Sequence, residues 1–178
     1  MTLKRLKVID VFIIFALCFL THFIYSWFPN TLFSIFFPVN ESIWEHMKML
    51  FSAIIIFSVV DFILLKVFEI KYRNFITSIF LSAVLSIIIF LAIYLPLYYF
   101  IGENMVLNLT VLFVSIVFSQ AVSYFVLESK DYGLLNYVSL IGIIFSYIVF
   151  GILTYYPPTE DLFYDPMDEK FGINTYNV

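Results

Sequence analysis

The chain has 178 residues, of which 63% are hydrophobic and only 12% are charged, and its mean hydropathy is +1.02. A soluble domain of this length would have about a quarter of its residues charged, because polar side chains must cover its surface. The composition therefore excludes a soluble globule and predicts an integral membrane protein. The formal net charge of −4 is less informative than the positions of the charges, which lie in short clusters between long apolar runs.

Five apolar runs are long enough to cross a bilayer, since a helix needs about 20 residues to span a hydrocarbon core of roughly 30 Å. The predicted spans are Val8 to Phe28, Met47 to Val67, Phe75 to Leu95, Met105 to Leu127 and Leu134 to Tyr156. The runs are continuous and lack the alternation of a transmembrane β-barrel. We therefore expect an all-α, polytopic transmembrane helical bundle that forms one domain, residues 1–178, in the cell membrane.

Proline and glycine mark the breaks between the predicted helices. Proline lacks an amide hydrogen and disfavours helical geometry in the residue before it. Pro96 follows the third run directly, so we expect that helix to end at Leu95. Pro157 and Pro158 likewise predict the end of the fifth helix and the start of an extended tail, residues 157–178.

The positions of the charges predict the orientation of the bundle, because basic residues of short loops stay in the cytoplasm. We interpret the first span as a retained signal anchor with a cytoplasmic N-terminus. In this orientation seven of the nine basic residues lie inside. These are Lys4, Arg5, Lys7, Lys66, Lys71, Arg73 and Lys130. The acidic residues on the outer side are then Glu41, Glu45, Glu103, Glu160, Asp161, Asp165, Asp168 and Glu169. An odd number of spans places the tail outside as well, where its apolar residues predict that it folds back over the helix ends.

The segment from Pro38 to Lys48 leads into the second span and has two interpretations. Ser42 and Glu45 have the spacing of a capping box, so the segment can simply start and orient a helix. Glu41 and Glu45 are also one turn apart on one predicted helix face, with His46 beside them. Carboxylates and an imidazole can ligate a divalent metal or transfer protons, and a helix N-terminus can hold a lipid phosphate. A surface for a protein partner is a third alternative.

His22 lies within the first predicted span, near its outer end. Ionisable residues in a span usually face the bundle interior or a wet cavity and have a partner there. The depth of His22 makes Glu41, Glu45 and His46 the candidate partners. The alternative is a neutral histidine that only makes a hydrogen bond to a neighbouring helix.

The candidate site combines these residues by role. Glu45 is the predicted base, and His22 and His46 are predicted ligands or proton shuttles. The candidate metal ligands are His22, Glu41 and His46, and the candidate ligand-binding residues are Asn40, Glu41, Lys48, Asn104, Asn108 and Asp165. In the inner half of the bundle, Asp10, Asp61 and Gln120 are expected to form interhelical hydrogen bonds, with a proton or cation site at Asp61 as the alternative.

Three stretches of the chain carry a resemblance to a known family. They are Leu20 to Tyr25, then Pro38 to Ser42 with Trp44, Glu45, His46 and Lys48, and finally Tyr156 to Pro158 with Leu162 to Pro166 and Phe171 to Ile173. On these residues the chain resembles domain-of-unknown-function family 6512, uncharacterised small bacterial membrane proteins, mostly from Firmicutes. The resemblance implies no activity. It implies a set of shared polar residues, which correspond here to His22, Asn40, Glu41, Glu45, His46, Lys48 and Asp165.

The predicted function is that of a membrane protein with an outward-facing polar pocket that binds or hydrolyses a lipid-linked or small ligand, with a divalent metal as the possible cofactor. Whether the protein is an enzyme stays open. The alternatives are a substrate-binding subunit of a transport system and a non-catalytic membrane scaffold. The expected partners are the lipid bilayer and such a ligand. Nucleic acid is excluded, because the chain has neither a glycine-rich phosphate loop nor a basic patch interleaved with aromatic residues.

Overall fold

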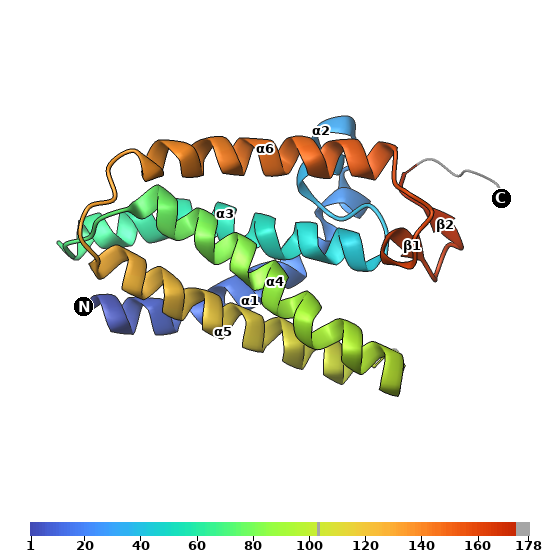
Figure 1. The fold of residues 1–178 in the computed structure, drawn as a ribbon, viewed down its shortest axis with the longest axis horizontal. Coiled ribbons are helices and arrows are strands. Elements are labelled where there is room, and N and C mark those ends of the chain that lie inside the picture. Colours follow the sequence, from blue (N-terminus) through green and yellow to red (C-terminus); the bar gives the residue numbers. More distant parts are fainter. Residues whose placement is uncertain (103, 174–178) are drawn as a thin grey trace.

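The structure, a computed structural model, describes residues 1–102 and 104–173. Within them the chain forms six α-helices followed by a short 3-10 helix and a two-stranded hairpin (Figure 1). The helices are α1 (Leu3–Trp27), α2 (Thr31–Phe36), α3 (Ile43–Val67), α4 (Phe75–Ile101), α5 (Met105–Glu128) and α6 (Leu135–Tyr155). The tail contains η1 (Asp161–Phe163) and the antiparallel strands β1 (Tyr164–Asp165) and β2 (Lys170–Phe171).

Five of these helices, all except α2, are long and apolar enough to cross a membrane. This confirms the predicted bundle of five spans. Large apolar side chains cover the outside of these helices, for example Phe12, Val59, Phe125, Ile141 and Phe145, each more than half exposed. In water such a surface would be strongly unfavourable, whereas in lipid it needs no cover. The fold is therefore that of an integral membrane protein.

Helix α4 does not end at Leu95 as expected from Pro96 but continues to Ile101. A proline inside a helix removes one backbone hydrogen bond, and transmembrane helices tolerate this loss where neighbours compensate for it. Here Leu97 and Tyr98, beyond the proline, still pack against the core. The helix ends one turn later, where the amide of Gly102, at φ +78°, donates to the carbonyl of Tyr98 at 2.8 Å.

Two rows of buried serines accompany the most extensive helix pair, α4 with α5. Ser78, Ser82 and Ser86 follow one another at four-residue intervals on α4, and Ser115, Ser119 and Ser123 do so on α5. Side chains four residues apart share a helix face, and small side chains let two membrane helices approach closely. Gln120 Nε2 of α5 donates to Ser82 Oγ of α4 at 2.9 Å.

The two ends of the bundle differ in charge. The N-terminus, the connection from α3 to α4 and the connection from α5 to α6 lie at one end, and α2 with the hairpin lies at the other (Figure 1). The first end carries all seven basic residues predicted to be cytoplasmic. The opposite end carries the predicted outer acids, except that Glu103 is outside the described residues. Which side of the membrane each end faces stays a prediction.

The tail is fixed to the helix ends by specific contacts. Asn40 Nδ2 donates to the carbonyl of Gly172 at 3.2 Å, and the amide of Ile173 donates to the carbonyl of Thr154 at 3.0 Å. The ring of Phe163 lies 5.0 Å from that of Trp44. These contacts join the segment before α3 to the last part of the chain.

Gly172 is the residue of the tail whose replacement we expect to matter most. Its φ is +59°, and an added Cβ would lie 2.5 Å from the carbonyl oxygen of Thr154. Gly133, at φ +54°, has nothing within 4 Å of such a Cβ and provides a matched control. Alanine at either position is strained at positive φ. In Gly172→Ala the added Cβ also collides with the backbone, which should lower the stability of the folded tail by about 1–3 kcal/mol more. Hydrogen exchange should show faster exchange of the Ile173 amide in Gly172→Ala only; equal exchange in both variants would contradict this.

Candidate functional site

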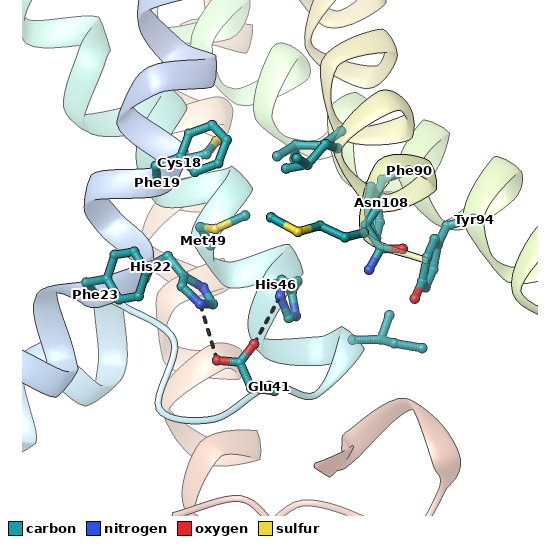
Figure 2. A pocket seen from close by; sticks show the side chains of 14 residues that line it. Cys18, Phe19, His22, Phe23, Glu41, His46, Met49, Phe90, Tyr94 and Asn108 are labelled. Carbon is teal, nitrogen blue, oxygen red and sulfur yellow. Dashed lines mark ion pairs between the residues drawn. The ribbon is translucent and has the colours of Figure 1, made fainter. Parts of the chain in front are cut away.

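A cavity of about 390 Å³ opens between α1, α3, α4 and α5 near the end of the bundle that carries α2. Most of its wall is apolar or aromatic: Cys18, Phe19, Phe23, Ile43, Met49, Phe90, Tyr94, Met105, Leu109 and Leu112. Its strongly polar lining residues are His22, Glu41, His46 and Asn108. The cavity therefore has an apolar interior and a concentrated polar region (Figure 2).

His22, Glu41 and His46 form the polar cluster of this cavity. His22 Nε2 lies 3.2 Å from Glu41 Oε1, and His46 Nε2 lies 3.6 Å from Glu41 Oε2. The two imidazole rings are 5.5 Å apart and both point to the carboxylate (Figure 2). One donor atom from each residue lies within 4.8 Å of the other two. His22 thus meets two of its three predicted partners.

Hydrogen bonds at the start of α3 fix the position of this cluster. Asn40 Oδ1 accepts from the amide of Ser42 at 3.0 Å, and Ser42 Oγ caps the helix by accepting from the amide of Glu45 at 3.3 Å. The carbonyl of Ser42 lies 2.9 Å from His46 Nδ1. Because a carbonyl only accepts, Nδ1 carries the hydrogen in this bond, and in neutral His46 the lone pair is on Nε2. That lone pair is directed at the cluster.

Glu41 is held in its charged form. Its side chain is 46% exposed, and the hydrogen bond from His22 lowers the pKa of its carboxyl below the usual range. Burial acts in the opposite direction, while the charges of His22 and His46 lower the pKa further. The cluster therefore offers one carboxylate and two imidazoles.

This set of donors fits a divalent transition metal. Catalytic zinc sites commonly have three protein ligands, among them two histidines with a glutamate, and keep the fourth position open. Ligand atoms at about 2.0–2.2 Å from a tetrahedral zinc are separated by about 3.3–3.6 Å. The imidazole nitrogens lie 3.2 Å from Glu41 Oε1 and 3.6 Å from Glu41 Oε2. With one ligand atom from each residue, all three separations are within 4.8 Å, somewhat wider than the spacing around a bound zinc.

Glu45 and Lys48 lie apart from this cluster, although Glu45 was the predicted base. Lys48 Nζ contacts Glu45 Oε2 at 2.5 Å, and both side chains are essentially inaccessible, at 0% and 1% exposure. Lys48 also donates to the carbonyl of Ser34 at 2.7 Å and to Thr154 Oγ1 at 2.8 Å. Thr154 in turn donates to Glu45 Oε1 at 3.0 Å. The pair therefore links α2, α3 and α6 and does not line the cavity.

The other predicted ligand-binding residues have mixed positions. Asn104 caps α5 by accepting from the amide of Leu107 at 3.1 Å. Asp165 is 1% exposed and accepts from the amide of Met167 at 2.9 Å, within the hairpin turn. Asn108 lines the cavity, and its buried Oδ1 has no hydrogen-bond partner within residues 1–102 and 104–173. Of these three residues, the structure brings only Asn108 to the cavity.

Sequence reasoning missed several residues that shape the region. Phe90, Tyr94 and Met49 line the cavity, and the hydroxyl of Thr154 makes a hydrogen bond to each member of the buried Glu45–Lys48 pair. Tyr94 lies near the end of an apolar run, a position where tyrosine is common at the membrane boundary and so does not indicate a cavity. Thr154 is the last polar residue of an apolar run, which is the one signal that could have identified it.

Comparisons with known proteins place the chain without assigning it an activity. The model of a family of unknown function, DUF6512, matches residues 1–173. The match covers every described helix and all residues of the cavity. Neither the curated proteins nor the solved structures contain a match.

We expect the Glu45–Lys48 pair to be essential to the fold. Lys48→Met leaves the Glu45 carboxylate buried without its cation, which typically costs about 3–5 kcal/mol. The double variant Glu45→Gln with Lys48→Met removes both charges and should recover most of this loss. Thermal unfolding of the purified variants in detergent measures both effects. Equal losses in the single and double variants would show that the charge pairing is not the cause.

Proposed function

We propose that this chain, which belongs to the family of unknown function DUF6512, binds a divalent metal, with zinc the best fit, at His22, Glu41 and His46. The metal and the cavity beside it then hold a lipid-linked or small amphipathic ligand at one end of a bundle in the cell membrane. The observation that carries this proposal is the convergence of two imidazole nitrogens on one carboxylate at the edge of an apolar cavity.

The donor chemistry supports the metal. Nitrogen ligands from histidine together with one carboxylate suit zinc and its neighbours, whereas calcium and magnesium prefer oxygen alone. The hydrogen bond from His46 Nδ1 to the Ser42 carbonyl is the kind of outer-shell contact that orients metal-ligating histidines. The carboxylate of Glu41 is already charged, so it needs to release no proton when a metal binds.

The cavity supports an amphipathic ligand. Its volume of about 390 Å³ lies within the range of small-molecule sites, and such sites combine apolar walls with a few convergent polar groups. An acyl or prenyl chain fits the wall formed by Phe19, Met49 and Leu112, with its polar end at the metal. Asn108 Oδ1, which has no partner in the part of the chain that the structure describes, could accept a hydrogen bond from the ligand.

Hydrolysis of the ligand is the second candidate function, and the donor set favours it. A bound zinc would act as a Lewis acid toward a carbonyl or phosphoryl oxygen. Glu45 is engaged with Lys48, so proton transfer would depend on Glu41 or on a histidine that is not ligating. We expect Glu41→Gln to keep the fold and to lose this chemistry.

Zinc binding to purified protein tests the metal proposal. We expect one zinc per chain after removal of adventitious metal, with affinity that falls on acidification because imidazole must lose its proton to bind. His22→Ala and His46→Ala should each weaken binding by roughly 100-fold or more, since even outer-shell changes cost about 10–100-fold. Asp168→Asn, which removes an exposed acid at the same end, is the control. Unchanged zinc content in both histidine variants would sink the proposal.

Native mass spectrometry tests the amphipathic ligand separately from the metal. Leu109→Trp fills the cavity from α5, and Val106→Trp, less than one turn away and 73% exposed, does not. We expect copurified lipid to be lost in Leu109→Trp alone, while zinc binding persists in both variants. Lipid bound equally to the two variants would show that the cavity is not its site.

A further inference from the structure

A second buried cluster of charges lies toward the opposite end of the bundle, between α1 and α3. Lys7 Nζ contacts Asp61 Oδ2 at 2.5 Å and Asp10 Oδ2 at 2.9 Å. The three residues are 5%, 0% and 4% exposed. Two carboxylates therefore share a single ammonium group away from solvent.

The charges of this cluster do not balance. With all three residues ionised, the cluster has a net charge of −1. The residues of α4 and α5 that line the small cavity beside Lys7 and Asp61 are uncharged: Ile79, Ser82, Gln120 and Ser123. Lys4 and Arg5, the neighbouring cations on α1, are exposed. An isolated charge in a medium of low polarity is very costly, so a group in this position neutralises or takes up a cation.

The cluster also has too few hydrogen-bond donors for its carboxylate oxygens. Asp61 Oδ2 accepts a hydrogen bond from Lys7, and Asp10 Oδ2 lies 2.9 Å from the same ammonium group. The second oxygen of each carboxylate, Asp10 Oδ1 and Asp61 Oδ1, is buried with no hydrogen-bond partner among the described residues. A proton on one carboxyl provides a donor for an oxygen of the other. Asp10 is the better place for the proton, because Asp61 makes the stronger contact with the ammonium group.

We propose that Lys7, Asp10 and Asp61 form a proton-binding site inside the bundle, in which Asp10 takes up one proton and Lys7 with Asp61 is left as a neutral pair. Binding converts the Asp10 carboxylate and a proton into a carboxylic acid. A cavity of about 10 Å³, lined by Lys7, Asp61 and Gln120 among others, is about the size of one water molecule. This site is independent of the metal and ligand proposed above.

Infrared spectroscopy of the protein in lipid nanodiscs tests this proposal. At neutral pH we expect the carbonyl band of one protonated carboxylic acid, sensitive to exchange into D2O. The band should disappear in Asp10→Asn and also in Asp61→Asn, because one carboxylate alone is balanced by Lys7. It should persist in Asp131→Asn, which removes an aspartate from the connection before α6. No such band in the wild type, or an unchanged band in Asp10→Asn, overturns the proposal.

Thermal unfolding provides a second measurement that does not depend on the band. Asparagine resembles the protonated acid, so Asp10→Asn should be at least as stable as the wild type at neutral pH and less sensitive to alkaline pH. A clear loss of stability in Asp10→Asn would overturn the proposal. A bound cation is the alternative source of the missing positive charge. In that case sodium chloride would raise the unfolding temperature, choline chloride would not, and the effect of sodium chloride would be absent in Asp61→Asn. That result would also overturn the proposal.

Discussion

The buried pair of Glu45 and Lys48 is the interaction on which the end of the bundle that carries α2 depends. Its polar atoms reach α2 through the Ser34 carbonyl, α6 through Thr154 and the segment before α3 through the amide of Val39. Each group is satisfied by hydrogen bonds as well as by the opposite charge, which is the condition under which a buried ion pair is tolerated. Because the pair fixes α3 relative to these neighbours, it also fixes the first turn of α3, which carries His46.

The same arrangement explains how the cavity acquires its polar edge. Ser42 caps α3, and its carbonyl accepts a hydrogen bond from His46 Nδ1, so the other ring nitrogen of His46 faces Glu41. Glu41 lies before the helix and reaches His22 of α1. The cluster therefore spans two segments that the apolar core alone would not align. Its polar groups converge because the capped helix start and the buried pair hold them there.

The sequence predicted the helices better than the site, for physical reasons. A run of about 20 apolar residues has few alternatives to a membrane helix, and the Ser42 cap followed from local spacing. Glu41 and Glu45 were assigned to one helix face, but α3 begins at Ile43, so helical spacing does not apply to Glu41. The two glutamates diverge, one to the histidines and one to Lys48. A tertiary contact such as that between Thr154 and Glu45 cannot be predicted from the spacing of residues along the chain. The helix end expected at Pro96 was wrong because Leu97, beyond the proline, still packs against the core.

Charge count and hydrogen bonding distinguish the two buried lysines, although both are paired with acids. Lys48 meets one carboxylate, whose two oxygens both accept hydrogen bonds, so the pair is neutral and complete, and its effect is on stability. Lys7 meets two carboxylates through one oxygen of each, and the other two oxygens have no hydrogen-bond partner among the described residues. Such a deficit can be removed only by a proton or another cation. The same residue types therefore hold the fold together at one end of the bundle and form a binding site toward the other.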